Sequence, residues 1–207
     1  MHDSDDAPLD PAEMLELVER QQLAVGLSFV KPVALLYTIW GVAWLAGFLL
    51  LWLAAVTAWM PLPVAATVFG ILMLVSVIVS GFIGARMGRG VQGASGFQSV
   101  VYGLAWPVTG IAFAAVGVAL VSHGMSVELA SLYFPSAYTL MVGILYLLGG
   151  ALWNARSQLV LGLVLIAVGS VAPFFGAPAN NLIMAIGGGG AFLIGAVHIM
   201  VVLRKLR

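Results

Sequence analysis

The sequence contains six long apolar stretches, each bounded by residues that favour turns. A helix needs about 20 apolar residues to cross roughly 30 Å of hydrocarbon, and each stretch is close to or above that length. None of them alternates between apolar and polar residues as the strands of a membrane β-barrel do. Because backbone amides in hydrocarbon must be paired within the segment, we predict an all-α fold, a bundle of six transmembrane helices. The predicted spans are 33–59, 62–83, 98–121, 133–153, 158–176 and 182–203.

The composition indicates that this region is surrounded by lipid. Hydrophobic residues make up 62% of the chain and charged residues 8%, whereas a soluble domain has about 25% charged residues. A water-exposed globule of this composition could not cover its surface with polar groups. The chain also has no cysteine, which excludes disulfides, thiolate nucleophiles and cysteine–zinc sites.

The charged residues are distributed unevenly along the chain. Seven of the eight acidic residues lie before residue 20, and only Glu128 follows Lys31. If the N-terminus is cytoplasmic, six crossings place all eight basic residues on the cytoplasmic side, as the positive-inside rule requires. Arginine outnumbers lysine six to two, and Ala, Gly and Val are abundant, which is typical of GC-rich bacterial genomes. We therefore expect a multi-pass protein of the bacterial cytoplasmic (inner) membrane with both termini inside.

A short pattern recurs in alternate predicted helices. WGVAW at 40–44 matches YGLAW at 102–106, and LGLVLIAVG at 161–169 is a weaker third match. The chain is therefore either three related helical hairpins or a chance recurrence among few residue types. Small residues let helix backbones approach closely in lipid, within one chain or between copies in an oligomer. We predict helix-packing roles for Gly41, Gly103, Gly162, Gly169, Trp44 and Trp106.

The last predicted helix contains four consecutive glycines within IGGGGAF, residues 186–192. Each glycine costs about 1 kcal/mol relative to alanine in an aqueous helix interior. Discontinuous helices line substrate sites in several transporter folds. The segment is therefore either a helix break along a transport path or a flat surface packed against the 158–176 helix. The candidate path residues are Gly187, Gly188, Gly189, Gly190 and His198, although His198 is equally suited to an interhelical hydrogen bond.

Common enzyme motifs are missing from the sequence. It has no G-x-x-x-x-G-K-[ST] nucleotide loop, no G-x-S-x-G elbow and no H-E-x-x-H zinc motif. The glycine-rich stretch GARMGRG, residues 84–90, has two arginines, as expected of a cytoplasmic loop that sets topology. The predicted spans contain no Asp, Glu, Lys or Arg, which disfavours proton-coupled transport. We expect no enzyme activity, cofactor, metal site or nucleic-acid partner.

An acidic arm, residues 1–31, precedes the transmembrane region, residues 32–207. Within it, DPAEMLELVERQQ (10–22) begins like a helix, with Asp10 at the cap position followed by proline. Helices that lie on a membrane surface are rich in Lys and Arg, whereas this arm has seven acids and two bases. We expect it to dock on a cytoplasmic protein or on the chain's own basic loops, or to be a solvated lead-in to the first span. The candidate docking residues are Glu13, Glu16 and Glu19.

The acidic arm followed by YTIWGVAWLAGFLLLW, residues 37–52, resembles small six-helix membrane proteins of actinobacteria that are often labelled transporters or permeases. The resemblance covers the arm and the first predicted helix. It implies a membrane location and a role in transport, and it assigns no functional residue. Two functions follow, of which the first is the leading interpretation. One is a permease-like subunit without its own ATPase; the other is a scaffold or regulatory protein whose arm binds a cytoplasmic partner.

Overall fold

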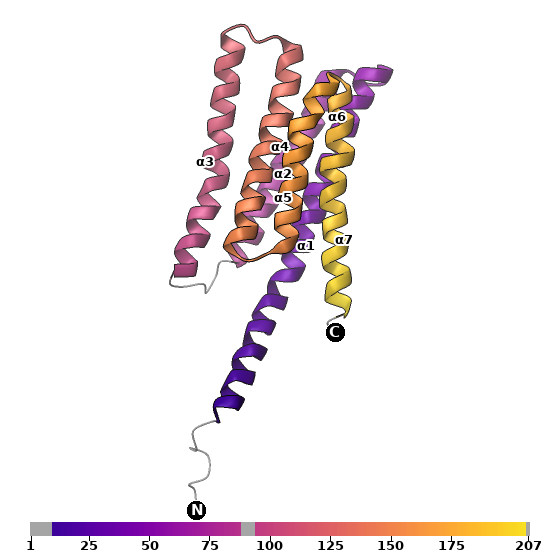
Figure 1. Ribbon diagram of the computed structural model, residues 1–207. Helices are drawn as coiled ribbons and strands as arrows, with labels where there is room; N and C mark the ends of the chain where they lie inside the picture. The colour runs from indigo at the N-terminus through magenta and orange to yellow at the C-terminus, as the bar shows by residue number, and fades with distance from the viewer. Residues whose placement is uncertain (1–9, 88–93, 206–207) are drawn as a thin grey trace, which may run out of the picture.

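The computed structural model describes residues 10–87 and 94–205, and it describes their side chains except at 19, 22–29, 94, 95 and 205. In these residues, six helical segments are long and apolar enough to cross a membrane. Figure 1 shows the segments side by side as a bundle. The predicted all-α bundle of six transmembrane helices is therefore confirmed.

The first four spans each lie in a single helix. These helices are α1 (Pro11–Thr57), α2 (Leu62–Met87), α3 (Ala94–Ser122) and α4 (Val127–Leu152). The fifth span consists of α5 (Arg156–Val171) and a 3-10 helix, η1 (Ala172–Phe175). The sixth consists of α6 (Ala179–Ile183), a π-helix called η2 (Met184–Gly189) and α7 (Gly190–Lys205).

Two helices begin well before the predicted spans. The fourth span begins at residue 127 instead of 133, because the Ser126 hydroxyl caps the helix by accepting a hydrogen bond from the Leu129 amide at 3.2 Å. Helix α1 begins at Pro11 and continues through Pro32 into the first span, so the arm and the span are one helix (Figure 1). Asp10 occupies the N-cap position of α1, but its side chain makes no capping hydrogen bond.

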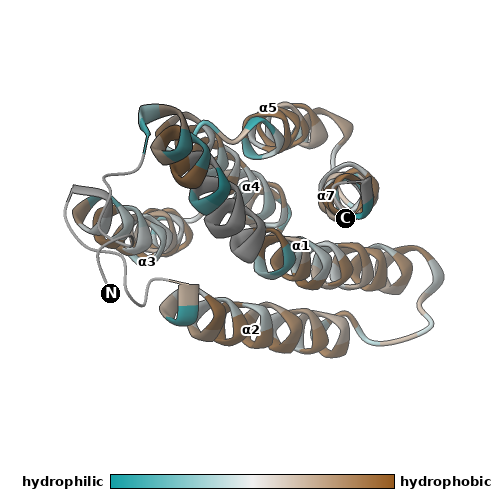
Figure 2. Ribbon diagram, turned by 90° about the horizontal axis from the view of Figure 1, so that it is seen from below, coloured by the Kyte–Doolittle hydropathy of each residue, from teal (hydrophilic) through white to brown (hydrophobic). Residues whose placement is uncertain are grey.

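The helices differ in how many neighbours they have. Figure 2 shows the arrangement from below: α1 and α4 lie in the middle of the bundle, α5 lies at the edge beside α4, and α7 lies beside α1. Helix α7 and η2 pack against both α1 and α5. On the outside, α2 packs mainly against α1, and α3 packs mainly against α4. The four helices α1, α4, α5 and α7 therefore form the core, and most of the surface of α2 and α3 faces outward.

The pair with the most extensive contact, α4 and α5, has glycines at its contact surface. An added Cβ at Gly162 would lie 2.6 Å from the Leu147 backbone nitrogen, and one at Gly150 would lie 2.7 Å from that of Leu159. Lipid provides no hydrophobic drive for helix association, so this pair is stabilised by the van der Waals contact that such close approach allows.

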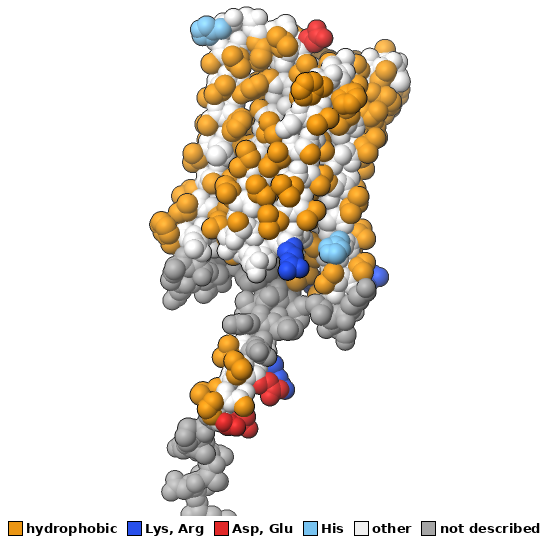
Figure 3. Space-filling view, viewed as in Figure 1, with side chains coloured by type: hydrophobic (Ala, Val, Ile, Leu, Met, Phe, Trp, Pro, Cys, Tyr) orange, Lys and Arg blue, Asp and Glu red, His pale blue; other side chains and the backbone are white. Residues whose placement is uncertain are grey.

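The two ends of the bundle differ in charge. Helices α1, α2, α5 and α7 place Lys31, Arg86, Arg156 and Arg204 at the same end, which we call the basic end. At the opposite end, the α3–α4 loop region contributes His123 and Glu128. Figure 3 shows this separation, with blue side chains at the lower edge of the bundle and one red side chain at the top. Both ends of the described chain lie on the side of the basic end (Figure 1).

Candidate functional site: the arm and the aromatic centre

The arm forms the part of α1 that precedes the first span. Residues 11–29 extend roughly 28 Å at 1.5 Å per residue, and Figure 1 shows this part projecting away from the bundle. Glu16 and Arg20 form an ion pair at 2.6 Å, one helical turn apart and largely exposed. It is the only ion pair among the side chains that the structure describes. The described arm residues Glu13 and Glu16 therefore form no ion pair with Arg86 or Arg156 of the basic end.

The exposed arm has one apolar side. Met14, Leu15, Leu17 and Val18 follow the i, i+1, i+3, i+4 spacing that places side chains on one side of a helix. Their exposed fractions are between 45% and 62%. Of the predicted docking residues, Glu13 and Glu16 are exposed on the other side, and the side chain of Glu19 lies outside the description. The arm thus presents an apolar strip bordered by carboxylates.

Aromatic side chains fill the middle of the bundle. We call Tyr37, Trp44, Trp106, Tyr146 and Phe192 the aromatic centre. The Phe192 ring packs edge to face on Trp44 at 5.5 Å between ring centroids, and on Tyr146 at 5.6 Å. Tyr146 in turn contacts Tyr37 and Trp106, each at 5.6 Å. The centre therefore joins α1, α3, α4 and α7 through edge-to-face ring contacts.

Several buried polar atoms lie around these rings. The Tyr102 hydroxyl donates a hydrogen bond to the Leu145 carbonyl at 2.9 Å. A Cβ on Gly149 would lie 2.6 Å from that hydroxyl and 2.7 Å from Gln158 Oε1, so the two polar groups are neighbours. Within the described residues, Gln158 Oε1 and the Tyr37 hydroxyl have no hydrogen-bond partner. Hydroxyl and amide groups can hold a small polar molecule by hydrogen bonds, but they supply no acid–base pair.

A second group of buried polar residues lies toward the opposite end. Asn180 is fully buried, and its Nδ2 donates to the Ser131 carbonyl at 3.0 Å. Thr139 donates to the sulfur of Met184 at 3.3 Å. This group could not be predicted from the sequence, because Asn180 belongs to the turn-like stretch GAPANN, residues 176–181, and no spacing pattern links that stretch to Thr139.

The four consecutive glycines are helical and not unwound: the first three end a π-helix and the fourth begins an α-helix. The π-helix η2 ends at Gly189, and α7 begins at Gly190. An added Cβ at Gly188 would lie 2.7 Å from Trp44 Cε3, and one at Gly189 would lie 2.6 Å from the Leu45 nitrogen. A Cβ at Gly187 would lie 2.8 Å from Val168 Cγ2 of α5. The glycines thus let the sixth span approach α1 at two positions and α5 at one.

His198 and Gly190 do not take part in this packing. A Cβ at Gly190 would have no atom within 4 Å. His198 lies on α7 with an exposed side chain and forms no hydrogen bond within the described chain. Their assignment to a transport path stays a prediction.

The predicted packing glycines are placed differently from one another. Gly41 packs against Leu193, where a Cβ would lie 2.8 Å from the Leu193 side chain. Gly162 and Gly169 lie in the α4–α5 contact. Gly103 has no atom within 4 Å of a Cβ position, because its side of α3 faces outward among the described residues. Trp44 is buried and Trp106 is half-buried, both within the aromatic centre.

In residues 10–87 and 94–205, no three His, Asp or Glu side chains lie close enough together to hold a metal ion. No protein-family model, curated protein or solved structure matches the chain. The six apolar spans with their segregated charge define a multi-pass integral membrane protein in contact with the lipid bilayer.

Proposed function

We propose that the protein is a membrane-anchored docking protein whose arm binds a protein partner in the cytoplasm. The observation that carries this proposal is the exposed apolar strip of Met14, Leu15, Leu17 and Val18 on a helix that projects from the bundle. Exposed apolar surface bordered by polar residues is typical of an interaction site. An amphipathic helix that places its apolar side in a partner's groove is a common recognition mode.

The charge of the arm favours a protein over the membrane as its ligand. Residues 1–31 carry seven acids and two bases. An anionic cytoplasmic leaflet attracts basic segments and repels acidic ones. The positive-inside rule puts the basic end, and with it the arm, on the cytoplasmic side. The expected partner surface is therefore an apolar groove with basic residues at its rim.

The filled centre of the bundle is consistent with an anchor. The rings of the aromatic centre contact one another across four helices, and Tyr37 and Phe192 are each 1% exposed. Glycines 187–189 are in close contact with α1 and α5 instead of lining an opening. These features serve helix association and do not require a substrate.

Transport by a permease-like subunit is the second candidate function. The π-helix η2 favours it, because π-helical turns inside helices are frequent at functional sites. The fully buried Asn180 lies one helical turn before that segment and could contribute to a polar substrate site. This candidate requires the sixth span to open in a second conformation.

Site-specific photocrosslinking in intact cells tests the docking proposal. A photoreactive benzophenone amino acid is placed at Val18 on the apolar strip or at Glu16 on the other side of α1. We expect a strong crosslink to a protein from Val18, at the middle of the strip, and a much weaker one from Glu16. A second substitution, Leu15→Asp, should reduce the Val18 crosslink about tenfold, since burial of a leucine side chain contributes about 1.5–3 kcal/mol.

The matched control is Ala12→Asp, which adds a charge to the side of the arm away from the strip. It should leave the Val18 crosslink unchanged. Equal crosslinking from Val18 and Glu16, or equal loss in the Leu15 and Ala12 variants, would contradict the proposal. So would a Val18 product that contains lipid alone.

A further inference from the structure

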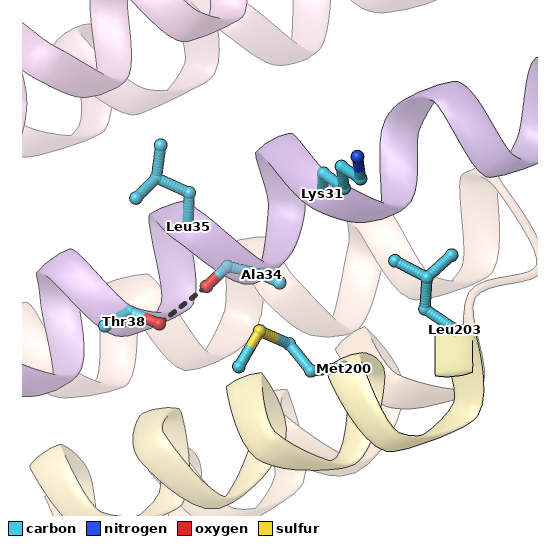
Figure 4. A pocket seen from close by; sticks show the side chains of 6 residues that line it. All are labelled: Lys31, Ala34, Leu35, Thr38, Met200 and Leu203. Carbon is cyan, nitrogen blue, oxygen red and sulfur yellow. Dashed lines mark hydrogen bonds between the residues drawn. The ribbon is translucent and has the colours of Figure 1, made fainter. Parts of the chain in front are cut away.

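A shallow hollow of about 180 Å³ lies on the outside of the bundle between α1 and α7, at the basic end. Figure 4 shows the side chains that line it. Helix α1 contributes Lys31, Ala34, Leu35 and Thr38, and α7 contributes Met200 and Leu203. The hollow opens on the surface that contacts lipid and is separate from the aromatic centre.

The hollow has an apolar wall, and Lys31 is the one cation among the described residues that line it. The Thr38 hydroxyl donates to the Ala34 carbonyl at 2.9 Å, so it is already paired within α1 (Figure 4). Lys31 is exposed, and it forms no ion pair with any residue that the structure describes. The Lys31 ammonium is therefore available to bind a ligand. Because it is positively charged, it favours an anionic one.

Along α1, the hollow extends from the membrane boundary into the hydrocarbon, as a phospholipid does from its headgroup into its acyl chain. The first span begins at Val30, which places Lys31 at the membrane boundary. Thr38 lies seven residues further along α1, or roughly 10 Å deeper at 1.5 Å per residue. The wall between these two residues is formed by Leu35 and Met200, which suit a hydrocarbon chain.

We propose that this hollow binds one anionic phospholipid. Its phosphate contacts the Lys31 ammonium, and one acyl chain lies against Leu35 and Met200. Arg204 follows Leu203 on α7 and adds a second exposed cation at the same end. Because the bundle has no described acid at this end, the local charge favours an anionic lipid over a zwitterionic one.

The test measures lipid retained by the purified full-length protein. The protein is reconstituted in nanodiscs of phosphatidylglycerol or phosphatidylcholine with identical acyl chains, and the lipid that stays bound is counted by native mass spectrometry. We expect one phosphatidylglycerol to be retained with about fivefold preference, since one basic residue near an anionic surface contributes about 1 kcal/mol. Lys31→Gln should abolish that preference, and Met200→Trp, which fills the hollow, should release both lipids.

Arg86→Gln is the matched control, because it removes a cation from the same end on α2, away from the hollow. It should leave retention unchanged. Equal losses in the Lys31 and Arg86 variants would overturn the proposal, because they would indicate general attraction to the basic end. Equal retention of the two lipids would also overturn it. A third contrary result would be thermal stabilisation by inorganic phosphate alone that equals stabilisation by phosphatidylglycerol.

Discussion

At the scale of single residues, the four consecutive glycines have different surroundings. Gly188 and Gly189 lie against α1, Gly187 lies against α5, and Gly190 faces open space. The same residue type thus has a packing role at three positions and none at the fourth. Composition alone does not distinguish these positions, since the neighbouring atoms belong to helices far away in the sequence.

Alanine substitutions at two adjacent glycines should therefore have opposite effects. Gly189→Ala would bring a Cβ to 2.6 Å from the Leu45 nitrogen, so it should lower the free energy of unfolding by about 1–3 kcal/mol. Gly190→Ala should leave it unchanged or raise it by up to about 1 kcal/mol through helix propensity. Unfolding in bicelles followed by steric trapping measures both. Similar changes in the two variants would mean that α1 does not pack on this segment.

At the scale of elements, the sixth span combines three kinds of helix. Its π-helical part places Gly188 and Gly189 against α1, and Phe192 of α7 then lies within the aromatic centre. This arrangement helps to distinguish the docking function from the permease-like function, because a transport path along the sixth span would have to pass these contacts.

Cysteine scanning of the sixth span separates the two functions. Single cysteines are placed from Ile183 to His198 in this cysteine-free chain and probed with a membrane-impermeant thiol reagent in cells and in inverted vesicles. Because Phe192 and Ala196 are buried at 1% and 3% exposure, we expect no labelling at either position. Asn181, near the start of the span, is the positive control. Labelling that continues past Gly190 along one side would favour the permease-like function.

The predicted repeat stays a prediction at this scale. Gly41 and Gly162 occupy matching positions of the repeat and both pack against a neighbouring helix, whereas the matching Gly103 does not. The physical reason is that α3 contacts mainly one helix, while α1 and α5 each lie between several.

At the scale of the whole molecule, charge and hydropathy divide the protein into an apolar bundle and a projecting acidic helix. The basic residues at one end of the bundle and the arm on the same side define a polarity that determines which compartment the arm can reach.

The orientation can be measured with two single cysteines. Gln21→Cys lies on the arm, and His123→Cys lies at the opposite end of the bundle; both positions are exposed. With the basic end in the cytoplasm, as the positive-inside rule predicts, an impermeant thiol reagent added to intact cells should label only the His123 variant. The reverse pattern would place the arm outside and would rule out a cytoplasmic partner.

Much of the architecture could be predicted from the sequence because the bilayer limits the alternatives. Each apolar stretch had to become a spanning helix so that its backbone amides were paired. The number of spans and their approximate ends followed from length and hydropathy. The start of α4 could not be found in this way, because it depends on a single capping contact by Ser126.

The candidate sites were predicted less completely. The acidic helix at 10–22 was recognisable from its residues, and its Glu16–Arg20 pair is local in sequence. The sequence did not indicate that α1 continues through Pro32 or that the arm projects from the bundle. The hollow between α1 and α7 brings Lys31 together with Leu203, two residues far apart in the sequence, so no local pattern could reveal it.

The sequence by itself thus determined that the protein lies in lipid, that it is all-α and that its basic residues gather at one end. These properties depend on transfer free energies and charges summed along each segment. Tertiary structure alone decided which glycines pack, which aromatic rings meet and which tyrosine and amide groups become buried neighbours. In lipid, hydrophobicity does not select among helix faces, so the choice depends on the shape fit and hydrogen bonds between helices that are distant in sequence.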